Sequence, residues 1–152
     1  TEIPLEQEKK HVNSYLSLEQ TRFPKKYIID YKISASPQTR VPPFCIQVLV
    51  ENSIRHAFPI RKSGNKITII VRETEQNVVI IVEDNGVGID PELLSRLGQE
   101  TIESSTGTGT ALVNLNRRLI GLYGNESHLQ ITSSEKGTII QINIPNNKAD
   151  TI

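Results

Sequence analysis

The chain has 152 residues, 36% of them hydrophobic, which is the usual size and composition of one domain with its own core. Seventeen basic and seventeen acidic residues leave no net charge, so we expect neither a nucleic-acid partner nor an anionic membrane surface. The single cysteine excludes an internal disulfide, and apolar runs such as 78–82 are far shorter than the roughly 20 residues that span a bilayer. Because the chain opens on Thr1 and contains no methionine, we interpret it as part of a longer protein.

The first third of the chain predicts a helix, a strand and a second helix. Apolar residues recur at near-helical spacing over 5–21, directly after Pro4, so we expect an amphipathic helix there. The β-branched and aromatic run 27–33 predicts a strand, and a Ser-Ala-Ser-Pro loop follows it. Pro43 suits the first position of a mostly buried helix over 44–58, because its missing N–H would have no partner there.

The middle of the chain predicts a hairpin followed by a loop. The β-branched runs 66–74 and 78–83 are separated by a short polar link, so we expect them to pair antiparallel. Residues 90–108 contain many turn-forming residues and one weak apolar cluster. We expect a mobile loop there, with one or two helical turns.

The last third predicts a helix and a second hairpin. Leucines at helical intervals predict a helix over 111–123, with Gly124 in the left-handed conformation just past its end. The runs 128–133 and 138–144 then predict a closing hairpin before a polar tail.

The order of these predicted elements decides the fold class. Strands and helices do not alternate regularly enough for a doubly wound parallel sheet, and two hairpins favour antiparallel pairing. We therefore expect an α+β fold in which helices cover one face of a mixed, mostly antiparallel sheet.

The first candidate motif is the segment 84–89 (Asp-Asn-Gly-Val-Gly-Ile), which follows an apolar strand. Asp84 can accept a hydrogen bond from an amino group such as the exocyclic nitrogen of adenine. Gly86 and Gly88 would let the backbone approach a flat ring closely. The same residues also favour a plain turn, and taken alone the segment supports either interpretation.

The second candidate motif lies on the predicted helix 44–58. Asn52, Arg55 and His56 stand at i, i+3 and i+4, so an α-helix places them on one face. An amide oxygen is a hard ligand suited to Mg²⁺, and the two basic side chains can contact phosphate. The alternative is a surface pair between Glu51 and Arg55, with Asn52 and His56 merely solvated.

The third candidate motif is Gly107-Thr108-Gly109-Thr110, immediately before the third predicted helix. Free N–H groups at a helix N-terminus favour an anion such as a triphosphate. A flexible loop with a threonine N-cap explains the same residues, and the lysine of a Walker-type loop is missing. The indication comes from the combination of all three motifs.

Together, the segments 49–56, 84–89 and 107–112 resemble the N, G1 and G2 boxes of the gyrase, Hsp90, histidine kinase and MutL superfamily. Segments 5–23, 41–44 and 122–124 resemble more narrowly the LytS/YehU-type sensor histidine kinases. The resemblance implies a Bergerat-type two-layer fold that binds ATP and Mg²⁺, with Asn52 as the metal ligand and Asn52, Arg55 and His56 as the catalytic group. It implies nucleotide contacts by Asn52, Arg55, His56, Asp84, Gly86, Gly88, Ile89, Gly107, Thr108, Gly109, Thr110, Leu112 and Thr138.

The same resemblance implies an organisation and a set of partners. Residues 1–24 would form a helix leading from an upstream dimerisation domain, 25–146 the ATP-binding catalytic domain and 147–152 a polar tail, with the 90–108 loop closing over ATP as a lid. The γ-phosphoryl group would pass to a histidine on the dimerisation domain, outside this chain, and then to an aspartate of a response regulator. The parent would be a membrane-anchored homodimer, with this part soluble and cytoplasmic.

Two positions depart from the superfamily pattern. Hydrolytic members carry a glutamate four residues before the metal-binding asparagine; here that residue is Val48, and Glu51 is rotated by about 100° from Asn52 on an α-helix. This departure favours a kinase over an ATPase. Ala111 stands where the third G2 glycine is common. The alternatives are therefore a serine kinase or ATPase of the same superfamily, or a degenerate module that binds a partner and holds nucleotide poorly.

The cysteine and the histidines complete the set of candidate residues. Cys45 lies near a predicted helix N-terminus, which can lower a thiol pKa, but a small core residue is the better interpretation. His11, His56 and His128 are too scattered for a metal site. None has the Pro-His-Phe context of the phosphoacceptor in the resembled subfamily, so we expect the acceptor outside this chain.

Overall fold

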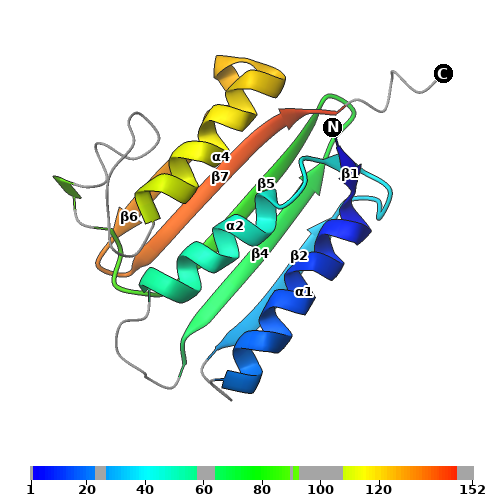
Figure 1. The fold of residues 1–152 in the computed structure, drawn as a ribbon. Helices are drawn as coiled ribbons and strands as arrows, with labels where there is room; N and C mark the ends of the chain where they lie inside the picture. The colour runs from blue at the N-terminus through cyan, green and yellow to red at the C-terminus, as the bar shows by residue number, and fades with distance from the viewer. Residues whose placement is uncertain (1, 23–26, 58–63, 90, 93–107, 147–152) are drawn as a thin grey trace.

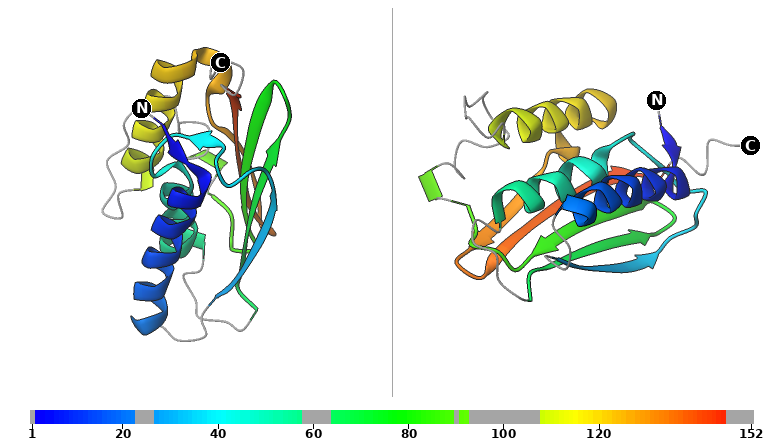
Figure 2. Two further views of the ribbon diagram at one scale, coloured as in Figure 1. Left: turned by 90° about the vertical axis from the view of Figure 1, so that its right-hand side faces the viewer. Right: turned by 60° about the horizontal axis from the view of Figure 1, so that its bottom comes forward.

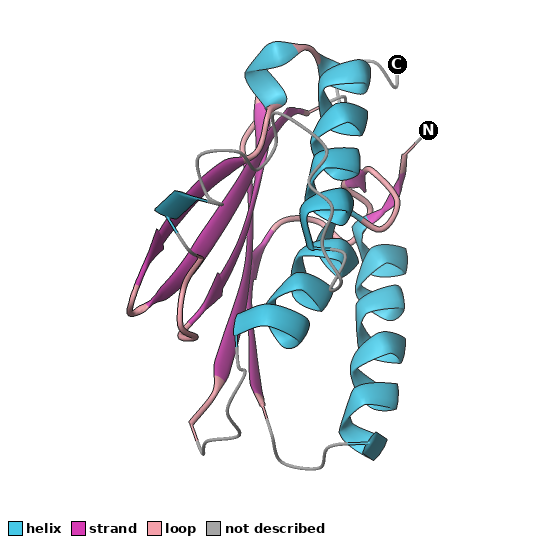
Figure 3. Ribbon diagram, turned by 60° about the vertical axis from the view of Figure 1, so that its left-hand side comes forward, coloured by secondary structure: helices cyan, strands magenta, loops and turns pink. Residues whose placement is uncertain are grey.

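A computed structural model describes residues 2–22, 27–57, 64–89, 91–92 and 108–146. Helices cover one face of a sheet, as predicted, and they form a layer of their own in Figures 1, 2 and 3. The helices are α1 (Leu5–Arg22), α2 (Cys45–Asn52), which runs into a π-helical turn η1 (Ser53–Ala57), and α4 (Thr108–Tyr123). The sheet has the order β2-β4-β5-β7-β6, made of β2 (Ile28–Ser34), β4 (Lys66–Glu73), β5 (Asn77–Asp84), β6 (Gln130–Ser134) and β7 (Gly137–Pro145).

The sheet is mixed, and its pairings follow the connections between strands. Strands β4 and β5 pair antiparallel, as do β6 and β7, so both predicted hairpins are confirmed. Strand β2 pairs parallel to β4, from Ile28 opposite Lys66 to Ser34 opposite Arg72. A parallel pair needs a crossover connection, and the chain supplies it by running through α2 between these two strands.

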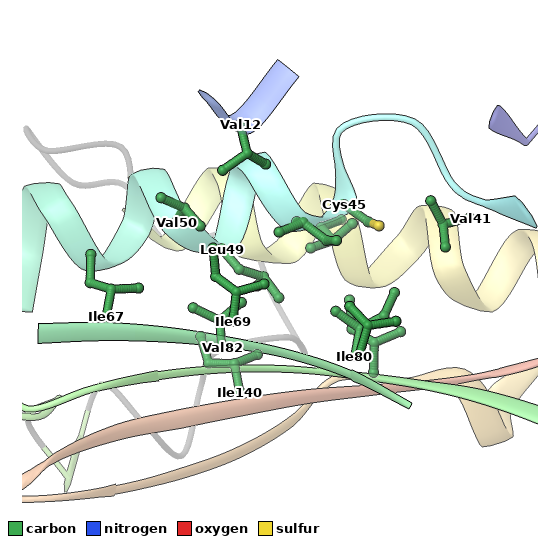
Figure 4. Close-up of a cluster of buried hydrophobic side chains, with 14 of the residues drawn as sticks. Val12, Val41, Cys45, Leu49, Val50, Ile67, Ile69, Ile80, Val82 and Ile140 are labelled. Carbon is green, nitrogen blue, oxygen red and sulfur yellow. The ribbon is translucent and has the colours of Figure 1, made fainter. Parts of the chain in front are cut away.

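The core lies between the helix layer and the sheet. Figure 4 shows Leu49 of α2 above Ile69, Val82 and Ile140, which come from three neighbouring strands. Inward-facing residues alternate along the strands, as the period of two requires; on β7 they are Ile140, Ile142 and Ile144. The sheet therefore presents one apolar face to the helices.

Helix α1 packs on α2 and contributes Leu5, Val12 and Leu16 to the same buried cluster as the strands. The helix begins one residue after Pro4, which belongs to the short strand β1 (Ile3–Pro4) paired with β3 (Arg40–Val41). No helix in the described ranges is both long and apolar enough to cross a membrane. The predicted division of the chain at residues 24 and 146 stays a prediction.

The start of α2 differs from the prediction. Pro43 lies in the preceding turn and the helix begins at Cys45, after Phe44 in a left-handed conformation with φ 64° and ψ 10°. The reason is a distant carboxylate: Glu8 of α1 accepts the N–H groups of Phe44, Ile46 and Gln47 at 2.7, 3.1 and 3.0 Å. Side-chain capping by a residue far away in sequence thus sets the first turn.

Helix α4 also begins elsewhere than predicted, at Thr108 rather than near 111. Its end is as predicted at Tyr123, and Gly124 has a positive φ of 98° but an extended ψ of 174°, so the chain leaves the helix directly for a 3₁₀ turn, η2 (Asn125–Ser127). Apart from helical backbone at 91–92 and 108, the predicted 90–108 loop lies outside the described residues, as does the tail 147–152.

Candidate functional site

Asp84 ends β5 with a largely buried carboxylate that accepts three hydrogen bonds. The Ser53 hydroxyl donates to Oδ2 at 2.9 Å, and the backbone N–H groups of Gly86 and Thr138 donate to Oδ1 at 3.0 and 3.3 Å. Burial raises the pKa of Asp84, and the three donors oppose that rise. The carboxylate is therefore an oriented acceptor with lone pairs left for a ligand.

Two glycines let the backbone pack closely around Asp84. A Cβ on Gly137, which has φ 140°, would stand 1.9 Å from the Asp84 carbonyl oxygen, and one on Gly88, with φ 81°, would stand 2.1 Å from the Ser134 carbonyl oxygen. Gly88 thus accommodates β6, and its approach to a flat ring stays a prediction. Gly137 was not among the predicted site residues; a glycine at the turn of a hairpin was the available signal.

Ile89 and Thr138, both implied by the resemblance, join the same polar network. The N–H of Ile89 donates to the Ser133 hydroxyl at 2.6 Å, and that hydroxyl lies 3.1 Å from the Thr138 hydroxyl. The Asn85 side chain makes other contacts. Its Oδ1 accepts the N–H of Lys66 at 2.7 Å, and its Nδ2 donates to the Gly64 carbonyl at 2.8 Å. Asn85 therefore ties the turn to the start of β4.

Asn52 is the last residue of α2, and 8% of its surface is exposed. Its amide oxygen is buried and has no hydrogen-bond partner among the described residues. Leaving a buried acceptor unsatisfied costs about 1–3 kcal/mol, which makes such an atom notable. A hard cation such as Mg²⁺ takes amide oxygens as ligands, so Asn52 fits the predicted metal role.

Arg55 and His56 lie in η1, where the chain is π-helical, so the predicted uninterrupted α-helix to residue 58 is wrong. The Arg55 guanidinium acts on the Tyr15 hydroxyl of α1. Burial, together with Glu19 and Glu51, raises the pKa of Tyr15 to about 12, while Arg55 opposes the rise. The His56 side chain lies outside the described part of the chain, and the nucleotide roles of both residues remain predictions.

The start of α4 lies at the same end of the helix layer as the end of α2, on the left in Figure 1. Thr108, Gly109 and Thr110 form its first turn, where N–H groups lack intrahelical acceptors. Their side chains, like Gly107, lie outside the described part. Leu112 is fully buried in the hydrophobic core, and its nucleotide contact stays a prediction.

The two departures from the superfamily pattern lie together. Val48 and Ala111 line a hollow of about 300 Å³ between α2 and α4, with Phe44, Asn114, Leu115 and Arg118. The lining contains no carboxylate. Cys45 is fully buried, and burial raises its pKa, so the interpretation as a core residue is confirmed.

Ser53 is the contact that the sequence interpretation missed. It is buried, follows Asn52 directly in the chain, and donates to the Asp84 carboxylate. The bond joins the end of α2 to the end of β5, and so connects the elements that carry the predicted metal ligand and the predicted adenine acceptor. Its position beside Asn52 was the available signal.

The family follows from this arrangement and from a direct comparison. Residues 44–148 match the model of the histidine kinase-, DNA gyrase B- and HSP90-like ATPases. The chain belongs to this family. The match spans α2, the Asp84 turn, α4 and the closing hairpin, and it confirms the resemblance seen in the three boxes.

Individual relatives within this family are similar to the chain along almost all of its length. The chain is 51% identical to sensor protein LytS of Streptococcus mutans over 98% of its length, and 50% identical to LytS of Bacillus subtilis over 94%. It spans 26% and 24% of those relatives, about a quarter of their length. The narrower resemblance to LytS-type proteins is thereby confirmed for this segment.

Solved structures confirm the fold. The catalytic domain of histidine kinase ThkA matches with a TM-score of 0.71 at 20% identity, covering 96% of this chain and 97% of that one. Histidine kinase AdeS of Acinetobacter baumannii matches with a TM-score of 0.69 at 18% identity, covering 97% and 68%. At such identities the likeness concerns the fold alone, and it is the α+β layered fold that was predicted.

Proposed function

We propose that this chain is the ATP-binding catalytic domain of a sensor histidine kinase. The observation that carries the proposal is the Asp84 carboxylate, buried at the end of β5 and oriented by Ser53, Gly86 and Thr138. An oriented carboxylate accepts a hydrogen bond from the adenine amino group and opposes guanine, which presents a carbonyl oxygen at that position. In this proposal, Asp84 recognises the adenine base of the nucleotide.

Phosphate and metal would be held on the helix side of the site. Asn52 would ligate Mg²⁺ through its unsatisfied amide oxygen, and the N–H groups of the first α4 turn would face phosphate oxygens. Bound Mg²⁺ would neutralise charge on the phosphates during transfer. Arg55 and His56 remain candidate phosphate contacts.

The partners in this proposal lie outside the chain. The acceptor would be a histidine on an upstream dimerisation domain of a membrane-anchored homodimeric parent, and a response regulator would receive the phosphoryl group next. Support comes from the LytS relatives, which are named sensor proteins, and from a crystal structure of ThkA in complex with the response regulator TrrA. The apolar Val48 at the position of the hydrolytic glutamate favours transfer to histidine over hydrolysis.

Calorimetry with a non-hydrolysable ATP analogue and Mg²⁺ tests the proposal. We expect binding by the chain, a preference for adenine over guanine nucleotides, and a loss of about tenfold or more in affinity for Asp84→Asn, because a hydrogen bond to a charged group contributes roughly 1.5–3 kcal/mol. Asp30→Asn is the control, since Asp30 is half-exposed and paired with Lys66 at 3.8 Å. Absence of binding by the unmodified chain would refute the proposal.

A transfer assay separates the alternatives. Adding a histidine-bearing dimerisation domain from a LytS relative should yield phosphohistidine on that domain, which would exclude a degenerate binding module. Steady-state release of phosphate by the chain alone would instead favour an ATPase. Phosphoserine on a supplied partner would favour the serine kinase.

A further inference from the structure

Glu8 of α1 is a fully buried carboxylate that the proposed chemistry does not use. Burying a charge is costly unless hydrogen bonds and favourable dipoles compensate it. Here the N–H groups of Phe44, Ile46 and Gln47 supply both, because they are the free donors at the positive end of α2. Glu8 therefore fixes the start of α2 against α1 from outside the helix itself.

The backbone at this contact is held in an uncommon conformation. Phe44 is the one residue other than glycine with positive φ among the described residues, at 64°. A bulky side chain rarely adopts that conformation and does so only where surrounding contacts impose it. Glu8 accepts the Phe44 N–H at 2.7 Å, and His11, one helical turn further along α1, stacks its ring on Phe44 with centroids 4.7 Å apart.

The other end of α2 carries the unsatisfied Asn52. The helix has eight residues and is about 12 Å long at 1.5 Å per residue, too short to bend appreciably. Its far end is tied to Asp84 through Ser53 at 2.9 Å. One carboxylate thus holds each end of the helix, and the location of the Asn52 amide oxygen depends on both.

We propose that Glu8 is a positioning residue for the metal ligand: by setting where α2 begins, it sets where the Asn52 oxygen lies relative to a bound nucleotide's phosphates. This inference rests on the proposed function, in which Asn52 binds Mg²⁺. Glu8 itself lies at the opposite end of α2 from Asn52 and touches neither metal nor nucleotide. Its effect should fall mainly on the metal-dependent part of binding, because two of the three donors that orient Asp84, the N–H groups of Gly86 and Thr138, do not belong to α2.

The test compares nucleotide affinity with Mg²⁺ and with a chelator, in the unmodified chain and in Glu8→Gln. Glutamine keeps one acceptor oxygen and places its amide NH₂ group against the remaining N–H groups. The start of the helix therefore loses at least one hydrogen bond. Changes in groups that orient a metal ligand typically cost 10–100-fold in metal affinity. We expect Glu8→Gln to lose about tenfold of the Mg²⁺-dependent gain, with affinity in chelator changed by less than about twofold.

Two controls separate positioning from stability. Val12→Ala leaves a cavity in the same α1 to α2 contact and should lower the melting temperature while keeping the Mg²⁺-dependent gain. Glu6→Gln, on the exposed side of the same helix, should change neither. If Glu8→Gln and Val12→Ala alter nucleotide binding in the same way, Glu8 is a stabilising residue only and the proposal fails.

The remaining outcomes are also decisive. Should Glu8→Gln not fold, Glu8→Asp keeps the charge with a shorter side chain and should still reduce the Mg²⁺-dependent gain; an unchanged gain in folded Glu8→Asp overturns the proposal. A loss of equal size with and without Mg²⁺ overturns it as well. If the unmodified chain binds no nucleotide, the proposed function fails first, a result visible before any variant is made.

Discussion

Burial has two opposing effects on the Asp84 carboxylate. The carboxylate must be buried to be shielded from water, yet burial disfavours the ionised form that accepts hydrogen bonds, and this raises its pKa. The donors Ser53, Gly86 and Thr138 compensate only in part, since the net direction of the shift is upward. The free protein therefore holds a carboxylate whose ionisation is less favourable than in the unfolded chain.

This predicts that the difference in stability between Asp84→Asn and the unmodified chain depends on pH. A group whose folded pKa exceeds its unfolded value of 3.8 loses stabilising effect as pH rises from that value through the folded pKa. Asparagine does not titrate. The free energy of unfolding of Asp84→Asn, relative to that of the unmodified chain, should therefore increase from about pH 4 to about pH 7. Urea unfolding at both pH values measures this. A difference that does not change with pH would contradict the prediction.

Sequence reasoning could select Asp84, Asn52 and Thr138 as candidates because local motifs, or the family pattern that contains them, carry these residues. It could not identify Glu8 as the cap of α2, because the contact joins residues 36 to 39 positions apart. Ser53 lies beside Asn52 in the chain, but its hydroxyl bonds Asp84 only once the fold brings together residues 31 positions apart. Long-range contacts require the fold, and no local pattern encodes them.

Among the elements, the hairpin β6–β7 constrains the position of Asp84. Its strand β7 opens on Gly137, where the backbone passes so close to the Asp84 carbonyl that a Cβ would stand 1.9 Å away. We expect Gly137→Ala to destabilise the chain by about 3–5 kcal/mol, since both the clash and the positive φ must be relieved. Nucleotide affinity should fall as well, because Thr138 donates to Asp84 from the next position.

Gly121→Ala is the matched control, because a Cβ there meets no atom within 4 Å and the residue lies inside α4. Alanine in a helix interior should raise stability by about 0.5–1 kcal/mol. Denaturant unfolding of both variants measures the contrast. Equal effects of the two substitutions would show that the close approach at Gly137 does not constrain the fold.

At the scale of the molecule, the predicted hairpins were right because neighbouring strands with short links pair locally. The parallel pairing of β2 with β4 was not predicted, since it depends on the passage of α2 over the sheet. The layered α+β class was nevertheless predictable from element order. The order of elements did not predict how α1 packs on the sheet and the other helices. In the structure, Leu5, Val12 and Leu16 of α1 belong to the buried core.

The chain should therefore not fold when it begins at residue 25, although the family pattern places a boundary there. Burying Leu5, Val12 and Leu16 contributes roughly 1.5–3 kcal/mol each, a sum comparable with the 5–15 kcal/mol that stabilises a typical domain. The loss of Glu8 also leaves the start of α2 uncapped.

We expect this truncated chain to show no cooperative thermal transition by circular dichroism and no nucleotide binding, and a peptide of residues 1–24 added in excess to restore both. A chain ending at Asn146 keeps the buried cluster formed by the described residues and should unfold like the full chain. A cooperative transition without α1 would instead mean that the sheet, α2 and α4 suffice, and that α1 is an attached helix, as the predicted boundary has it.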